Sequence, residues 1–404
     1  MPSQVGIEWS GELRERWEVN DAAGFGLGDV GNDDYLLHRV RLGADWHLSS
    51  SFRLVGELIS GSASGWGNPA SAVQSDSADL LQGYAAIGIP LAEGRAELRL
   101  GRQEISLGSS RLVSVRESPN VRRAFDGVRM SWSGAADAHA ELFLVRPVQP
   151  EKGAFDDGTT AGQSFWGLDL AVAPAWLPQN LKVETYYLGY RRAAGRFGGD
   201  TAVEKRHSAG ARLYGETGAN DWNMEAVWQW GTFGATSIRA WTLSADMGIT
   251  LTQAPMSPRL GLKADAISGD EDPHDARLQT FNPLFPKLPY FSEANLASPA
   301  NLLDIQPSAR LRLSGALTAT LSWNALWKFA REDAFYVPAL DAQPGTANNE
   351  ARYIGQQYGI AAEWQVTQPL QAAATIVHFE PGRLIRDAGG RSGNFAAVSL
   401  QYQF

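Results

Sequence analysis

Arginines at alternating positions are the residues of this sequence best suited to a chemical role. Arg39 and Arg41 are two positions apart, and so are Arg310 and Arg312. Guanidinium groups bind carboxylates in a planar, bidentate geometry and stay charged at physiological pH. Side chains two positions apart in a β-strand point to the same face. We therefore expect rows of fixed positive charge on one face of a sheet, which is a surface that attracts anions.

Other residue groups are less convincing candidates for a functional site. The acidic run containing Asp270, Asp272 and Asp275 is a candidate Ca²⁺ site, because Ca²⁺ prefers clustered oxygens, but it lacks EF-hand spacing and a solvated acidic loop is favoured. His378 lies near a predicted strand end, where a barrel hydrolase would act, but no recognisable nucleophile motif accompanies it. The chain has no cysteine, no zinc-ligand spacing and no phosphate-binding glycine loop. We expect no cofactor.

The elements that must position the arginines are strands, because apolar and polar residues alternate from end to end. One face of a single segment is apolar and the other polar: Trp241, Leu243, Ala245, Met247, Ile249 and Leu251 against Thr242, Ser244 and Asp246. Such alternation is typical of strands with two different faces, and helical spacing does not explain it. No stretch is long and apolar enough for a transmembrane helix.

About eighteen such segments follow one another. They begin near Gln4, Asp34, Ser51, Leu80, Arg95, Arg123, Ala138, Phe165, Leu181, Glu204, Asp221, Ile238, Pro258, Asp304, Leu317, Arg352, Leu370 and Asn394. Every second connection is short and rich in turn formers. The others are mostly long: residues 21–33, 61–79, 106–121, 149–164, 268–303 and 331–350.

Short and long connections in alternation predict an all-β fold, a transmembrane up-and-down antiparallel β-barrel with short periplasmic turns and long extracellular loops. The patterning never changes character, so residues 1–404 form a single domain. Tryptophans and tyrosines near strand ends fit the aromatic girdles of a barrel in a bilayer, whereas a soluble β-sandwich gives no reason for them. A net charge of −9 argues against nucleic-acid binding. We expect a monomer in the bacterial outer membrane.

If the apolar face of each strand meets lipid, the basic residues line the lumen, since charges facing lipid near the midplane are costly. The predicted lumen residues are Arg14, Arg39, Arg41, Arg53, Arg99, Arg129, Lys182, Lys263, Arg310 and Arg312. Acidic residues fall on the same face, so the charges could also form an ion-pair network that only braces the wall. For the arginine set as a whole we favour an anion pathway.

A second group of arginines surrounds the connection at residues 106–121. This connection either folds inward as a constriction or stays outside, where its charges meet lipopolysaccharide phosphates. Of the two placements we favour the constriction. The group consists of Arg102, Arg111, Arg116, Arg122 and Arg123.

Several runs resemble the alginate export porin family. They are residues 101–108 (GRQEISLG), 119–129 (PNVRRAFDGVR), 280–286 (TFNPLFP) and the pair Tyr290–Phe291, and the chain ends in an aromatic strand with Phe404. The resemblance covers nearly the whole chain. It implies an eighteen-stranded outer-membrane barrel with an arginine-lined pore for an anionic polysaccharide. The chain departs from the alginate exporter itself in having no long periplasmic turn, so the solute and the direction of transport stay open.

The sequence thus predicts a porin that passes an anionic or saccharide-like solute by passive diffusion. The solute is an alginate-type polyuronate or a smaller carboxylated compound. Two other functions remain: an outer-membrane barrel hydrolase acting at the outer rim, and a non-conducting structural or adhesin barrel. A barrel of eighteen strands argues against the last, because it encloses an aqueous lumen unless it is plugged.

Overall fold

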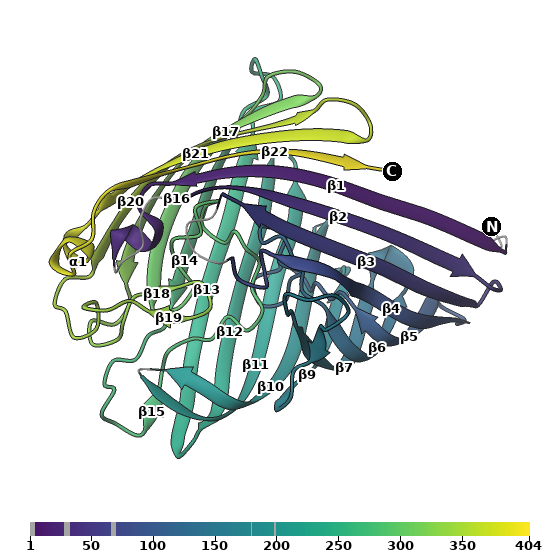
Figure 1. Cartoon of the computed structure of the whole chain (residues 1–404), viewed down its shortest axis with the longest axis horizontal. Helices are drawn as coiled ribbons and strands as arrows, with labels where there is room; N and C mark the ends of the chain where they lie inside the picture. The colour runs from purple at the N-terminus through teal and green to yellow at the C-terminus, as the bar shows by residue number, and fades with distance from the viewer. Residues whose placement is uncertain (1–4, 28–32, 66–69, 179, 198) are drawn as a thin grey trace.

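Eighteen antiparallel strands close into one barrel in the computed structural model, which describes residues 5–27, 33–65, 70–178, 180–197 and 199–404 (Figure 1). The barrel strands are β1 (Gly6–Asn20), β2 (Asp33–His47), β3 (Phe52–Ser64), β4 (Asp76–Pro90), β5 (Arg95–Gln103), β6 (Phe125–Ser133), β7 (His139–Gln149), β9 (Gln163–Val172), β10 (Leu181–Phe197), β11 (Asp200–Thr217), β12 (Asn220–Phe233), β13 (Thr236–Thr250), β14 (Arg259–Ile267), β16 (Leu302–Arg312), β17 (Leu317–Lys328), β20 (Tyr353–Gln365), β21 (Leu370–Pro381) and β22 (Gly393–Gln403). The first and last strands pair, with Leu13 opposite Tyr402, and this pairing closes the barrel.

The predicted strands are confirmed one by one. The largest displacement of a start is four residues, as at β4, where the prediction was Leu80 and the strand begins at Asp76. Gln4, the first predicted start, lies outside the described residues. Because β3 extends to Ser64 and β4 begins at Asp76, the predicted long loop at residues 61–79 is shorter than expected. Asp76 and Asp79 therefore belong to a strand and not to a loop.

Burial follows the predicted alternation. On β1, Trp9 and Leu13 are 64% and 50% exposed, whereas Glu12 and Arg14 are 3% and 4% exposed. This is the reverse of a soluble protein, in which the large apolar side chains would be covered. The outward band of apolar residues suits hydrocarbon, and the polar residues face the lumen.

Both chain ends lie at the same end of the barrel, on the right in Figure 1. The connections at this end are short, and we call it the short-turn end. The opposite, long-loop end carries most of the long connections, with the small elements β8 (Gly158–Thr159), β15 (Arg277–Leu278), β18 (Tyr336–Val337), β19 (Asp341–Ala342) and α1 (Arg383–Asp387). Two connections there are tight, between β10 and β11 and between β12 and β13. In the described residues, no helix is long and apolar enough to span a bilayer.

The buried apolar core lies inside the barrel, where the long loops meet inward-facing strand residues. Phe285, from the connection after β14, packs edge-on against Phe125 and Phe165 with ring centroids 5.1 and 5.0 Å apart. Phe25 contacts Phe379 in the same way at 4.4 Å. Aromatic packing of this kind fixes loops to the wall. The loops are therefore part of the lumen and not only a rim.

Candidate functional site: a lumen crossed by two loops

Most of the predicted lumen cations form ion pairs along the wall from β1 to β7. Arg39 bonds Glu12 (2.6 Å), Arg41 bonds Glu57 (2.6 Å) and Glu12 (3.1 Å), Arg53 and Arg99 share Glu97 (3.1 and 2.6 Å), and Arg129 bonds Glu141 (2.7 Å). Each pair joins neighbouring inward-facing positions. These arginines thus have their charge balanced locally, which weakens the field that they present to a passing anion.

The remaining predicted cations of the wall are spread along the short-turn half of the barrel. Lys182 bonds Asp137 at 3.0 Å, and Arg310 bonds Glu363 at 3.0 Å. Lys263 donates to the Tyr290 carbonyl at 2.8 Å. Arg312 is exposed and has no side-chain partner among the described residues.

The connection at residues 104–124 enters the lumen and is held on one side by β1, β2 and β3. The Asn120 amide donates to the carbonyls of His38 and Ser62, at 2.9 and 3.0 Å. Arg14 donates to the Glu117 carbonyl at 2.9 Å, and Arg39 bonds the Glu117 carboxylate. Arg14, a predicted pore residue, therefore anchors this loop.

The same loop reaches the opposite wall. Arg111 bonds Glu225 at 3.0 Å and lies 4.0 Å from Asp265. Glu225 is on β12, the eleventh barrel strand, so it faces β1 and β2 across the lumen. We call residues 104–124 the crossing loop. The crossing loop thus lies inside the barrel, which is one of the two placements that the sequence left open for this segment.

The predicted constriction arginines differ in their partners. Arg122 bonds Glu104 (2.6 Å) and Glu117 (2.8 Å). Arg116 and Arg123 have no carboxylate within 4.0 Å among the described residues; they donate only to the carbonyls of the crossing loop itself, and the Arg123 guanidinium lies over a ring of the second loop described below. Two positive charges of the crossing loop thus remain unbalanced.

Arg102 does not belong to the constriction, contrary to the prediction. The β5 strand continues to Gln103, so Arg102 shares the outward face with Leu100, which is 44% exposed. There Arg102 bonds Asp126 at 2.9 and 3.1 Å near the long-loop end. Counting by twos from Leu98 and Leu100 places Arg102 on their face, but the run Gly101–Gln103 has no apolar alternation that would have shown that the strand continues.

A second loop, residues 268–301, pairs with the crossing loop inside the barrel, and the sequence did not predict this. Val113 and Phe285 form a parallel bridge, with the Phe285 amide donating to the Leu112 carbonyl at 2.9 Å. The Lys287 amide donates to the Ser110 carbonyl at 2.9 Å. Phe285 belongs to the family-like run 280–286 and Lys287 follows it, but nothing in that run indicated which way it would fold.

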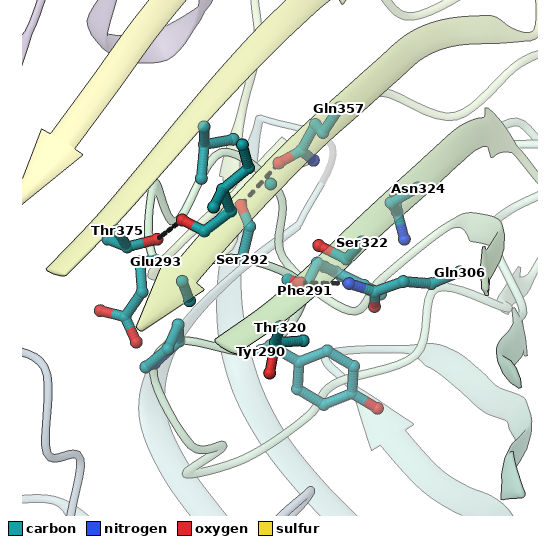
Figure 2. A pocket seen from close by; sticks show the side chains of 15 residues that line it. Tyr290, Phe291, Ser292, Glu293, Gln306, Thr320, Ser322, Asn324, Gln357 and Thr375 are labelled. Carbon is teal, nitrogen blue, oxygen red and sulfur yellow. Dashed lines mark hydrogen bonds between the residues drawn. The ribbon is translucent and has the colours of Figure 1, made fainter. Parts of the chain in front are cut away.

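A pocket of about 230 Å³ lies between the second loop and the wall of β16, β17, β20 and β21 (Figure 2). On the loop side, Ser292 donates to Gln357 at 2.5 Å and the Phe291 carbonyl accepts from Gln306 at 3.1 Å. The wall side presents hydroxyl and amide groups: Gln306, Thr320, Ser322, Asn324, Gln357 and Thr375. Glu293 is the one charged lining residue in the described part of the chain. The lumen thus has a neutral, hydrogen-bonding wall on these strands in addition to the ion-paired wall of β1 to β7.

Lys287 adds a third loop cation without a carboxylate within 4.0 Å in the described residues, and its ammonium lies 5.9 Å from the centroid of the Tyr290 ring. Burial, with the nearby charges of Lys263 and Arg111, lowers the pKa of Lys287 to about 8. Arg116, Arg123 and Lys287 form a set that we call the free loop cations. They differ from the ion-paired arginines of the wall in having no counter-charge.

The weaker candidates of the sequence do not assemble into sites. Asp272 and Asp275 accept hydrogen bonds from the backbone of their own turn, and Asp270 does not join them in a cluster of convergent carboxylates within the described residues. His378 bonds Asn394 at 2.8 Å and stacks on Tyr358. No serine hydroxyl of the described chain is bonded to it, so a serine–histidine pair is not formed there.

A closed eighteen-stranded barrel with an apolar outer band and a polar lumen defines the porin class of outer-membrane proteins. The sequence matches the alginate export family over residues 6–399, and the chain belongs to that family. Its place is the bacterial outer membrane. No curated protein matches the chain.

Solved porin structures share the fold. Over 98% of this chain, it resembles Acinetobacter baumannii OccAB3 (TM-score 0.67, 9% identity, 99% of that chain) and a BenF-like porin from Pseudomonas fluorescens (0.66, 10%, 98%). Pseudomonas aeruginosa OccK2, solved in complex with glucuronate, is similar over 98% of this chain and 96% of its own (0.63, 11%). At these identities the likeness concerns the fold.

Proposed function

We propose that the protein is a passive outer-membrane channel for small solutes that combine a carboxylate with sugar-like hydroxyl groups. The observation that carries this proposal is the set of free loop cations. Arg116, Arg123 and Lys287 lie on the two loops that narrow the lumen and have no carboxylate within 4.0 Å among the described residues. A narrow zone with net positive charge lowers the barrier for anions.

The neutral wall supports the saccharide part of the proposal. Hydroxyl and amide side chains such as Thr320, Ser322 and Gln357 offer donors and acceptors to the hydroxyl groups of a sugar. The carboxylate would meet the loop cations while the ring slides along the neutral wall. Many weak contacts let a solute enter and leave again, as conduction requires. The glucuronate complex of OccK2 supports the solute class, because glucuronate carries both kinds of group.

The proposal includes a monomer that is not an enzyme. His378, the histidine considered for hydrolysis, contacts Asn394 and Tyr358 and has no nucleophile beside it in the described residues. The non-conducting adhesin remains the main rival, because two loops cross the lumen. Single-channel current in planar bilayers separates the two functions, since an adhesin would be silent.

The test of the solute class is block of ion current by added sugars. We expect glucuronate to interrupt the current in a concentration-dependent manner, and uncharged glucose to do so only at much higher concentrations. Neutralising one loop cation should weaken block by glucuronate about fivefold, since a contact with one charge in an aqueous lumen is worth about 1 kcal/mol. Equal block by glucose and glucuronate would contradict the proposal.

A further inference from the structure

Four aspartates from two distant segments converge near the long-loop end of the barrel. Asp76 and Asp79 are on β4, and Asp156 and Asp157 are on the connection between β7 and β9. One carboxylate oxygen of each lies within 4.8 Å of the others. Asp76 and Asp79 are each only 1% exposed. Burying carboxylates side by side is unfavourable unless a cation or hydrogen bonds compensate.

Hydrogen bonds within the protein compensate these charges only in part: Asp79, Asp156 and Asp157 each accept one backbone amide, at 3.2, 3.0 and 2.7 Å. Both carboxylate oxygens of Asp76 and one of Asp79 are buried and accept no hydrogen bond in the part of the chain that the structure describes. The guanidinium of Arg102 is nearby, but it bonds Asp126 and the carbonyls of Leu80 and Asp157. The cluster therefore has buried oxygens with free lone pairs that point to a missing positive partner.

We propose that Asp76, Asp79, Asp156 and Asp157 bind a calcium ion. Ca²⁺ takes six to eight oxygen ligands at about 2.3–2.6 Å, so ligands on opposite sides of the ion are about 5 Å apart, which matches the spread of the four oxygens. Mg²⁺ demands a tighter octahedron and retains several waters, so it fits this set less well. Asp156 is exposed and gives the ion a path from solvent.

The ion would fasten the loop after β7 to the start of β4. The two segments already form a parallel bridge at Ala78 and Ala154, and the Phe155 amide donates to the Ala78 carbonyl at 3.0 Å. Without the ion, the four carboxylates repel one another across this contact.

Calcium titration by isothermal calorimetry tests the site on the detergent-solubilised full chain after removal of divalent ions with EDTA. We expect saturable binding of one Ca²⁺ and its loss in D76N/D79N. The matched control is D272N/D275N, which removes the same charge from an acidic turn that forms no cluster and should bind as the wild type does. Absence of Ca²⁺ binding by the wild type, or equal binding by D76N/D79N, would overturn the proposal.

Limited trypsin digestion gives a second readout that does not depend on the buried variants folding. Lys152 is exposed in the loop that the ion would fasten. Cleavage after Lys152 should be slower in Ca²⁺ than in EDTA for the wild type, and equally fast in both for D156N, an exposed substitution. Cleavage of the wild type at the same rate with and without Ca²⁺ would count against the site.

Discussion

Arg111 of the crossing loop bonds Glu225 of β12 at 3.0 Å, and this ion pair ties a loop that starts at β5 to the far side of the barrel. Both residues are buried, at 6% exposure each. With Asn120 held by β2 and β3, the loop is fixed at both walls. The width of the lumen therefore depends on side-chain contacts as well as on the strand number.

Arg111→Gln should release one end of the crossing loop. Leaving Glu225 buried without its partner costs about 3 kcal/mol of stability, and single-channel current should become larger and noisier because the loop moves. The control is Arg102→Gln, which breaks an ion pair on the outward face and should leave the current unchanged. Identical current noise in Arg111→Gln and the wild type would show that the loop is held by other contacts.

Asn120→Ala should release the other end. The Asn120 amide serves three backbone carbonyls, those of His38, Ser62 and Gln74. Leaving buried acceptors unpaired costs about 1–3 kcal/mol, measurable as a lower midpoint of thermal unfolding followed by circular dichroism. Asn220→Ala, at the exposed start of β12 where the side chain makes no hydrogen bond within the described residues, is the comparison and should unfold as the wild type does.

Strand number and strand faces could be predicted because they depend on local alternation. Shifting the assignment of faces in a strand by one residue would turn all of its charged side chains towards lipid. The sequence of each strand therefore shows by itself which residues face the lumen. Arg102 was misplaced because it was grouped with the arginines around the connection at residues 106–121, although it lies on the outward face of the preceding strand.

Contacts between distant segments could not be predicted in this way. The pairing of Val113 with Phe285 joins two loops, and no local pattern reports it. The same holds for Asp76 and Asp157, which come together only because the loop after β7 folds back on β4. Which cations keep a counter-charge, as Arg41 does and Arg123 does not, follows from these long-range contacts.

Lys287 should make the selectivity depend on pH. Its pKa is lowered to about 8 by burial and by the charges of Lys263 and Arg111, with Asp246 and Asp265 acting in the opposite direction. The ammonium is therefore charged below pH 8 and becomes neutral as the pH rises through that value. Anion selectivity, measured as reversal potential in a salt gradient, should fall between pH 7 and pH 9. Lys287→Met should already have the lower anion selectivity at pH 7, and its selectivity should not change between pH 7 and pH 9. If the selectivity of this variant still falls over that range, another group is responsible for the pH dependence.

Arg310 and Arg312 should contribute unequally to the anion selectivity of the channel. Arg310 is balanced by Glu363 at 3.0 Å, whereas Arg312 has no side-chain partner in the described chain. We expect Arg312→Gln to reduce anion selectivity and R310Q/E363Q, which removes a balanced pair, to leave it unchanged. Equal reversal potentials for Arg312→Gln and the wild type would remove this residue from the anion pathway.

The most direct test of the proposed channel is the reversal potential of the variant R116Q/R123Q/K287Q under a KCl gradient, compared with the wild type and with R310Q/E363Q. The free loop cations should make the wild type and the balanced-pair control select chloride over potassium, and their removal should move the reversal potential of the triple variant most of the way to zero, leaving the part that Arg312 contributes. A triple variant as selective as the wild type would contradict the role of these three residues and, with it, the proposed anion pathway.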